Sequence, residues 1–363
     1  MNAKPNDDRL APLRARIDEL DQKIVQLLNE RASVVVEIGH VKRDDQSPIY
    51  APERERRVLE QVRRYNEGPL PDTCLEAIWR ELMSGSFALE RPLRIGYLGP
   101  PGSFSHLAAR RKFGASVEYD ALSDIPAVFD EVVRGHVDYG LAPIENSAVG
   151  GISETLDSFL NSQVRICAEL LINIHHNVLS KVPFDQVRKI YSKPEALGQC
   201  RKWLAAQRQD IEIVAAASTS KAAEYAAEMP HTAAIGSTLA AEVYGLKVVF
   251  ANIEDNPHNT TRFFIIGKQQ PKPTGDDKTS IMFTTEHKAG ALTSVLDVFR
   301  DFGINMTHID KRPSKRVNSE DIFFVALMGH EQSEQVARSI DEARTHCLQL
   351  TVLGSFPCAR DVL

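Results

Sequence analysis

The sequence has little cysteine, no excess of basic residues and no long apolar run. Its five cysteines are widely spaced and form no CxxC pair, which indicates reduced thiols and argues against a disulfide framework or a metal site. The net charge of -6, with basic and acidic residues interspersed, argues against nucleic-acid binding. No apolar run is long enough to cross a bilayer, and the polar residues 1–8 do not form a signal peptide. We expect a cytoplasmic protein that binds neither nucleic acid nor a membrane.

What the sequence does contain is a long helical periodicity near its start. Apolar residues recur there in steps of three and four, as on the buried stripe of one long helix: Leu10, Leu13, Ile17, Leu20, Ile24, Leu27, Val34, Ile38 and Val41. The same count passes through Arg31, and Lys42 lies on nearly the same face. A buried charge needs an anionic partner. Two interpretations remain open: both cations bind one small anion, or the helix is a coiled coil in which Arg31 snorkels or pairs with Glu30.

The chain divides into three segments of different periodicity, in line with the two or three domains expected for 363 residues. Residues 1–92 read as an all-α helical bundle. Its first helix, about 50 Å long, is too long for two short helices to cover, so we expect an interlocked homodimer. Residues 93–270 read as an α/β domain of two lobes with a cleft, and residues 278–363 show the βαββαβ order of an α+β ferredoxin-like domain.

In the middle segment, short β runs alternate with helices such as 126–134 and 194–207. The predicted strands fall at residues 94–99, 116–120, 139–142, 166–174, 189–191, 211–216, 232–235, 248–251 and 263–266. We expect the chain to cross between the lobes near His176 and to return near Asn256. His175 and His176 have no second cluster at metal-binding spacing, which favours core or hinge histidines.

Three motifs of this segment lie where ligands bind in open α/β sheets. The turn 99–105 (GPPGSFS) follows a strand and opens a helix, so it is either an anion site or a plain strand–helix turn. The segment 143–147 (PIENS) follows a strand, where ligand groups gather, although a loop cap would look the same. The segment 259–263 (NTTRF) lies at the predicted return crossing, where its hydroxyls and guanidinium would line the cleft.

Polar residues also accumulate on inward positions of the helical segment. Ser86 and Glu90 continue the inward stripe of the third predicted helix, and Arg54 with Glu55 opens the second. Such an interior would make a poor oligomerisation coil and a good pocket for a small dicarboxylate.

Taken together, these motifs resemble three known families in sequence. The first ninety residues resemble the helical chorismate mutases, residues 94–268 resemble the prephenate dehydratases through GPxGSFS, PIENS and TRF, and residues 279–357 resemble the ACT regulatory domain. Their order is that of the bifunctional family of phenylalanine biosynthesis. The resemblance implies that chorismate is rearranged pericyclically to prephenate and that prephenate is dehydrated and decarboxylated to phenylpyruvate. It also implies feedback inhibition by phenylalanine, and no cofactor.

For the mutase, the resemblance implies a pocket of residues from both chains of a dimer. Lys42 would donate to the ether oxygen opposite Glu90, Glu55 would accept from the ring hydroxyl, and arginines would clamp the carboxylates. The remaining substrate-binding residues it implies are Arg14 of the partner subunit, Arg31, Arg54 and Ser86. Two positions depart from the family pattern, because Ala51 stands where an aspartate is frequent and Glu90 where glutamine is frequent.

For the dehydratase, the family's catalytic threonine corresponds to Thr261. A lone hydroxyl is a feeble acid, so it needs a relay, and Glu145 is the nearest expected proton source. The substrate-binding residues implied by the resemblance are Asn146, Ser192, Gln199, Ser218, Thr219, Ser220 and Arg262. The family's acidic residue before the Ser-Thr-Ser run is Ala217 here.

For the ACT segment, the resemblance implies an effector site at Gly290, Ala291, Leu292 and Arg312. Lys311 replaces a serine of the family motif. The alternative is a plait that only dimerises. A non-catalytic, amino-acid-responsive regulatory protein with a two-lobed ligand domain is the alternative for the whole chain. The absence of a basic recognition helix argues against a DNA-binding version of it.

Overall fold

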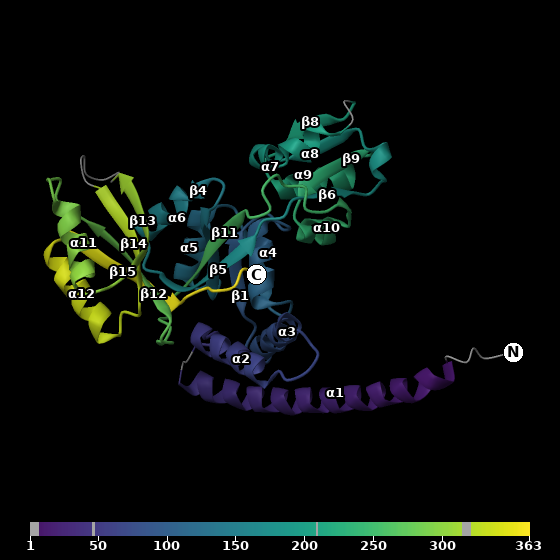
Figure 1. Cartoon of the computed structure of the whole chain (residues 1–363), viewed down its shortest axis with the longest axis horizontal. Coiled ribbons are helices and arrows are strands. Elements are labelled where there is room, and N and C mark those ends of the chain that lie inside the picture. The colour runs from purple at the N-terminus through teal and green to yellow at the C-terminus, as the bar shows by residue number, and fades with distance from the viewer. Residues whose placement is uncertain (1–6, 46–47, 208–209, 314–320) are drawn as a thin grey trace.

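The computed structural model describes residues 7–45, 48–207, 210–313 and 321–363. Three α-helices come first: α1 (Asp7–Asp44), α2 (Pro52–Tyr65) and α3 (Asp72–Glu90). The shorter two lie over the C-terminal part of α1, whose N-terminal part extends away from the rest of the chain (Figure 1). The apolar stripe of α1 is therefore exposed within one chain, with Leu13 at 59% and Leu27 at 64%. Within the described residues, no helix combines the length and apolarity that a membrane span requires.

The first lobe is built on a mixed sheet of six strands in the order β2–β1–β3–β11–β5, with β4 beside β3. These strands are β1 (Arg94–Leu98), β2 (Glu118–Leu122), β3 (Tyr139–Asn146), β4 (Gly150–Gly151), β5 (Arg165–Asn173) and β11 (Thr260–Gly267). Its helices are α4 (Phe104–Phe113), α5 (Ile125–Arg134) and α6 (Ser153–Phe159). Strand β11 runs antiparallel to both β3 and β5, and it carries the chain back from the second lobe.

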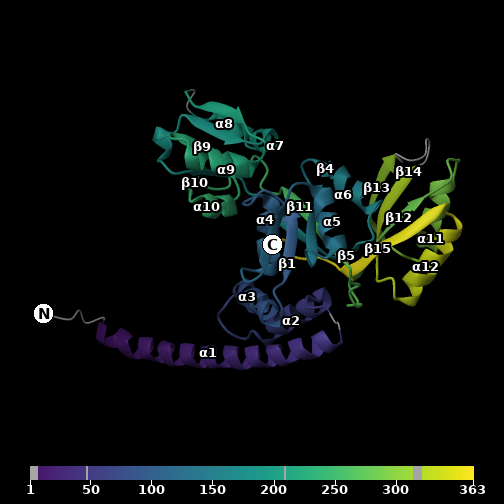
Figure 2. The same cartoon turned by 180° about the vertical axis from the view of Figure 1, so that it is seen from behind.

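The second lobe is a separate sheet of five strands in the order β10–β6–β9–β7–β8 (Figure 2). These are β6 (Asn177–Ser180), β7 (Lys189–Ser192), β8 (Glu212–Ala215), β9 (Thr232–Gly236) and β10 (Lys247–Phe250). Its helical elements are the 3₁₀ turn η1 (Phe184–Gln186), α7 (Pro194–Gln199), α8 (Arg201–Ala205), α9 (Thr219–Glu228) and α10 (Thr238–Tyr244). The chain enters this lobe through residues 174–176 and leaves it through residues 251–259, as the sequence predicted.

One predicted helix of this lobe, over residues 194–207, is in fact two. The helix is interrupted at Cys200, where Asp255 of the return crossing bonds to both sides of the break. The Asp255 amide donates to the carbonyl of Gln199 over 2.6 Å, and its carboxylate accepts from the Lys202 amide over 3.0 Å. The break therefore ties the end of α7 to the crossing segment.

The C-terminal segment is an antiparallel sheet of four strands in the order β13–β14–β12–β15 with two helices. Its elements are β12 (Asp277–Thr284), α11 (Ala291–Asp301), β13 (Met306–Pro313), β14 (Asp321–Met328), α12 (Glu334–Thr345) and β15 (Gln349–Pro357). The two helices share one core with the sheet. Other side chains of the sheet, including Phe324 and Phe356, belong to the core of the first lobe, with Phe129 and Phe264. This segment is thus fused to the first lobe through a common core.

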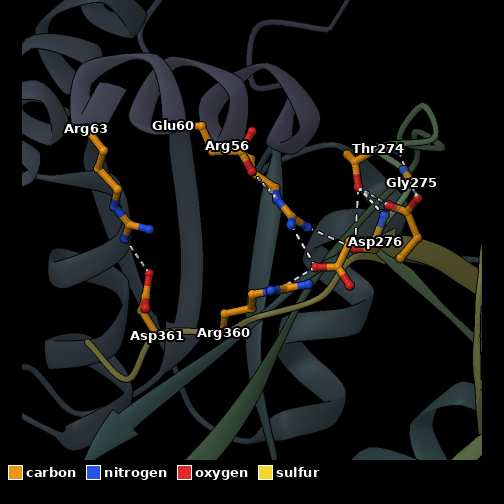
Figure 3. Close-up of polar contacts among 9 residues, drawn as sticks. Arg56, Glu60, Arg63, Thr274, Gly275, Asp276, Arg360 and Asp361 are labelled. Carbon is orange, nitrogen blue, oxygen red and sulfur yellow. Dashed lines mark hydrogen bonds and ion pairs between the residues drawn. The ribbon is translucent and has the colours of Figure 1, made fainter. Parts of the chain in front are cut away.

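An ion cluster joins the helical segment to the C-terminal segment (Figure 3). Asp276, just before β12, accepts from Arg56 of α2 and from Arg360 of the C-terminal tail, each over 2.7 Å. The tail then returns to the first lobe, where the Leu363 amide donates to the Leu171 carbonyl over 2.8 Å. The helical segment is therefore anchored to the rest of the chain by side-chain contacts as well as by the connecting residues.

Candidate active sites

The helical segment brings together two of the predicted polar pairs. Arg31 of α1 donates to the Ser86 hydroxyl of α3 over 2.9 Å, and Lys42 donates to the Glu90 carboxylate over 2.9 Å. A Cβ at Gly39 would lie 3.2 Å from the Cα of Glu90, so a glycine here allows the two helices this close approach. The cationic positions of the α1 stripe thus face polar partners on α3, as a pocket requires.

A cavity of about 530 Å³ lies beside the Lys42–Glu90 pair, between the helical segment and the first lobe. The first lobe contributes Asp138 and Lys268 to its lining. The side chain of Glu90 is only 9% exposed, and that of Lys42 is 26% exposed. Both are therefore shielded enough for their charges to act strongly on a small ligand.

Glu55 already has hydrogen-bond partners within the single chain. Its carboxylate accepts from Lys112 of α4 over 2.7 Å and from the Tyr50 hydroxyl over 3.1 Å. Burial and then repulsion by Glu55 raise the pKa of Tyr50 well above its usual value, which keeps this hydroxyl protonated as a donor. In the single chain, one oxygen of Glu55 therefore already binds Lys112 of the first lobe, and acceptance from a substrate hydroxyl stays a prediction for this residue.

The two remaining arginines of the predicted mutase pocket are exposed on the surface of the single chain. Arg54 lies in the first turn of α2. Arg14 lies on α1 about 26 Å from Arg31, at 1.5 Å per residue. Arg14 and Arg31 of one chain therefore cannot bind the same small molecule.

The catalytic threonine predicted for the second reaction is held between two strands of the first lobe. Thr261 of β11 stands opposite Asn146 of β3 in the sheet register. The Asn146 amide donates to the Thr261 hydroxyl oxygen over 2.7 Å, and Thr261 is only 7% exposed. The structure thus unites the PIENS and TTRF motifs in one site at the junction of the lobes.

Glu145 and Arg262 are also opposite each other in the register, with their charged atoms 3.5 Å apart. Because neighbouring side chains on a strand point to opposite faces, this pair lies on the other face of the sheet from Asn146 and Thr261. Arg262 lines a cavity there with Lys278 of the C-terminal segment. This placement contradicts Glu145 as the proton source for Thr261 and Arg262 as a ligand on the same side.

Polar residues of the second lobe gather at the carboxyl ends of its parallel strands. Ser192 ends β7, where its hydroxyl donates to the Ile235 carbonyl over 2.8 Å. Ser218 follows β8 and caps α9, with Thr219 and Ser220 in the first turn. The Ser220 hydroxyl is buried without a partner in the described part of the chain. Open α/β sheets bind their ligands at this edge, so these residues are suitably placed for an anionic substrate.

Two further residues lie within the site: Asn259, which begins the predicted NTTRF segment, and His176, to which no substrate-binding role was assigned. The Gln199 side-chain oxygen accepts from the Asn259 amide over 3.1 Å and lies 2.7 Å from His176 Nε2. His176, read from the sequence as a core or hinge residue, is 2% exposed. Its position at the predicted crossing was the only signal for this role. In the described ranges, no cluster of His, Cys, Asp or Glu is arranged to hold a metal ion.

In the C-terminal segment, the predicted effector residues lie at the same end of the sheet. Gly290 caps α11 with φ +82, a left-handed conformation that favours glycine, and Ala291 and Leu292 follow it. Thr284 at the end of β12 and Arg312 of β13 are both opposite Ile322 of β14 in the sheet register. The loop between β12 and α11 and Arg312 are therefore at the same end of the sheet.

The structure corrects the expected role of Arg312, however. Its guanidinium donates to the Ser153 hydroxyl of α6 over 2.6 Å and lies 3.5 Å from the Asp157 carboxylate. In this structure Arg312 therefore binds the first lobe and does not stand free for an effector.

Comparison with known proteins gives matches along nearly the whole chain. Residues 13–91 match the chorismate mutase type II family, and residues 95–271 match the prephenate dehydratase family. A bifunctional chorismate mutase/prephenate dehydratase of Stutzerimonas stutzeri is 42% identical over 359 residues, which are 97% of this chain and 98% of that protein.

Solved structures resemble the larger part of the chain. A prephenate dehydratase of Arthrobacter aurescens in complex with L-Phe has a TM-score of 0.68 at 29% identity, covering 74% of this chain and 90% of that one. GqqA, described as a quorum quenching acylase, has the same TM-score of 0.68 at 26% identity, covering 74% and 98%. Since the fold alone does not determine the reaction, function follows from the full-length relative and the two family matches.

Proposed function

The chain belongs to the bifunctional chorismate mutase/prephenate dehydratase family, and we propose how its residues carry out and regulate the two reactions. It is an enzyme of phenylalanine biosynthesis that converts chorismate into prephenate and prephenate into phenylpyruvate. A non-catalytic regulatory protein is not supported, because the relative that matches 97% of the chain is an enzyme with both activities in its name.

For the mutase, catalysis consists of binding the compact conformer of chorismate and stabilising the charge on its breaking ether bond. The reaction is pericyclic and forms no covalent intermediate, so positioning and electrostatics supply the acceleration. Arg31, oriented by Ser86, binds one carboxylate, and Lys42 donates to the ether oxygen. The Arg31–Ser86 and Lys42–Glu90 contacts of 2.9 Å support these roles.

The mutase pocket is completed by a second chain. Arg14 is about 26 Å from Arg31 along α1, so Arg14 of the partner subunit must supply the second carboxylate clamp. The exposed apolar stripe of α1 is the surface on which the partner packs. An antiparallel arrangement of the two α1 helices places the N-terminal part of each over the C-terminal part of the other, which makes an interlocked homodimer.

For the dehydratase, Thr261 donates a hydrogen bond to the departing 4-hydroxyl of prephenate. The carbon–oxygen bond breaks and the hydroxyl leaves with the bonding pair as hydroxide, which takes one proton from the solvent to become water. The ring carboxylate leaves as CO₂, and the electrons of its broken carbon–carbon bond complete the aromatic ring. The 2.7 Å bond from Asn146 to the Thr261 oxygen is the observation on which this role rests, because it directs the threonine's own hydrogen elsewhere. Gln199 and the second-lobe hydroxyls bind the polar groups of the substrate.

The C-terminal segment acts as an ACT regulatory domain that binds phenylalanine at residues 290–292. The phenylalanine complex of the Arthrobacter aurescens dehydratase supports an effector of this kind. The core shared by this segment and the first lobe gives effector binding a direct mechanical connection to the dehydratase. Coupling of this type typically amounts to about 1–3 kcal/mol.

The Thr261→Ala variant tests the dehydratase proposal. We expect prephenate turnover to fall by ~10²–10³, as when one transition-state donor is lost, with mutase activity unchanged. Thr260→Ala, on the other face of the same strand, is the matched control and should keep dehydratase activity within about threefold. Normal prephenate turnover by folded Thr261→Ala would show that the threonine is not the donor.

A further inference from the structure

Five polar side chains form one continuous hydrogen-bonded chain across the junction of the lobes: His176, Gln199, Asn259, Asn146 and Thr261. We propose that His176 and Asn259 are positioning residues that keep the Thr261 hydroxyl oriented as a hydrogen-bond donor to the substrate. This inference rests on the proposed role of Thr261. It adds a histidine from one crossing segment and an asparagine from the other to the dehydratase site.

The orientation of the Asn146 amide is set by the backbone. Its side-chain oxygen accepts from the amides of Ala148 and Val149 over 2.9 and 3.1 Å. The NH₂ group must therefore point the other way, toward Thr261 at 2.7 Å and Asn259 at 3.1 Å. Both of its hydrogens are used, and both acceptors are determined.

This arrangement fixes the role of the threonine. Because the Thr261 oxygen accepts from Asn146, its own hydrogen has to point elsewhere. In the part of the chain that the structure describes, that hydrogen has no acceptor. The hydroxyl is thus available to donate to a ligand at the junction, which is what the departing hydroxyl of prephenate requires.

The same logic extends outward to the histidine. The Asn259 oxygen is an acceptor, so its NH₂ group faces Gln199 and donates to the glutamine oxygen over 3.1 Å. An oxygen at 2.7 Å from His176 Nε2 can only accept, so that ring nitrogen carries the hydrogen. The Gln199 NH₂ group is then turned away from both partners and is available to the substrate.

His176 is itself held in place by its backbone and by the packing of its ring. Its backbone amide donates to the Glu254 carboxylate over 2.9 Å, and its ring packs edge-on against Phe104 with centroids 5.4 Å apart. Burial lowers the pKa of the imidazole, which keeps it neutral. Its Nδ1 is buried without a partner among the described residues. Burying the Nδ1 atom without a hydrogen-bond partner destabilises the fold. The hydrogen bond that the Nε2–H group donates to Gln199 is what the buried histidine contributes in return.

The test measures prephenate turnover by His176→Leu and His176→Gln, with His175→Leu as the matched control. His175 pairs with Glu254 and does not contact the chain of side chains. We expect His176→Leu to lower kcat about tenfold with KM within about twofold, the effect of one neutral hydrogen bond. Glutamine offers an NH₂ donor, so His176→Gln should recover most of that loss. His175→Leu should change kcat less than about twofold.

A double variant separates positioning from a structural effect. If His176 acts through Thr261, His176→Leu should cost nothing further in the Thr261→Ala background. An additional tenfold loss there, or equal loss of mutase and dehydratase activity, would overturn the positioning role. If Thr261→Ala alone keeps full turnover, the proposed role of Thr261 fails instead, and the two failures are distinguishable. Loss of kcat in His176→Gln equal to that in His176→Leu would also contradict the proposal.

Discussion

Glu90 stands at a mutase position where the sequence resemblance implies that glutamine is frequent. It forms an ion pair with Lys42 over 2.9 Å, on the side of the pocket where the ether oxygen of chorismate is expected. A carboxylate there would repel the negative charge that develops on this oxygen, whereas an amide would donate a hydrogen bond to it. Glutamine at the same position would be a donor at every pH.

We expect Glu90→Gln to raise mutase kcat/KM, because it replaces a carboxylate that repels the ether oxygen with an amide donor of nearly the same shape. The measurement is mutase kcat/KM, with the dehydratase activity of the same preparation as the internal control. A folded Glu90→Gln protein with the wild-type mutase kcat/KM would show that Glu90 does not face the substrate.

Residue positions could be predicted from motifs, but their faces could not. The sequence placed the motifs of Thr261 and Asn146 beside the same cleft, so their proximity could be predicted. The wrong role for Glu145 arose because the strands were predicted to be too short. Strand β3 continues through Asn146 and β11 already begins at Thr260, so side chains alternate through both motifs. Once both motifs are strands, Glu145 and Thr261 must lie on opposite faces.

Helix α1 has an apolar stripe that no other part of the same chain buries along its full length. Its apolar stripe was predicted from periodicity, and the structure leaves Ile17 and Ile24 56% and 52% exposed. We expect Ile24→Glu to separate the proposed dimer and to lower mutase activity about tenfold or more, because the proposed contribution of Arg14 from a second chain would be lost. Dehydratase activity should persist, since the Thr261 site contains no residue of α1.

The control for this variant is Gln22→Glu, which adds the same charge about 160° away on α1. Sedimentation should give a monomer for Ile24→Glu and the wild-type mass for Gln22→Glu, with both activities assayed on each. A fully active Ile24→Glu monomer would contradict a pocket built from two chains.

Structural features that depend on contacts between residues far apart in the chain could not be predicted from the sequence. The helix predicted over residues 194–207 has no breaking residue at Cys200, and the break exists because Asp255 bonds to Gln199 and Lys202. Likewise, Lys112 forms an ion pair with Glu55 although the two are 57 residues apart. Local patterns carry no information on such pairs.

At the scale of the whole molecule, the Asp276 cluster holds the helical segment against the tail and the C-terminal sheet (Figure 3). Hydrogen bonds from Arg360 and then Arg56 lower the pKa of Asp276 from 3.8 to about 2. A folded-state pKa below the unfolded one means that this stabilisation is complete above pH 3.8 and is lost as the pH falls toward 2.

Asp276→Asn should therefore be less stable than the wild type at neutral pH, with the difference shrinking as the pH is lowered. Thermal unfolding of both proteins between about pH 6 and 2 measures this difference. A constant difference across that range would show that the ionised Asp276 is not what the cluster depends on.

The core shared by the C-terminal segment and the first lobe determines how regulation can be tested. Deleting the C-terminal segment would expose Phe264 and its neighbours, which share a core with Phe324 and Phe356. A point variant is therefore the better test. We expect Leu292→Ala, in the half-buried first turn of α11, to reduce phenylalanine inhibition of the dehydratase about tenfold while uninhibited turnover stays normal. Unchanged sensitivity would place the effector elsewhere.

The order of the three segments was readable from the sequence, whereas their docking was not. Contacts such as Arg312 with Ser153 and Arg56 with Asp276 join residues far apart in the chain. The sequence assigned Arg312 to an effector because the motif suggested it, and only the packed structure shows that its guanidinium binds α6.

We propose that this protein performs two consecutive reactions at two separate sites. The most direct test supplies chorismate alone to the purified protein at neutral pH and follows chorismate, prephenate and phenylpyruvate with time. We expect phenylpyruvate from the wild type and accumulating prephenate from Thr261→Ala, with equal rates of chorismate loss. Chorismate left unconverted by the wild type, or phenylpyruvate formed at the wild-type rate by Thr261→Ala, would contradict it.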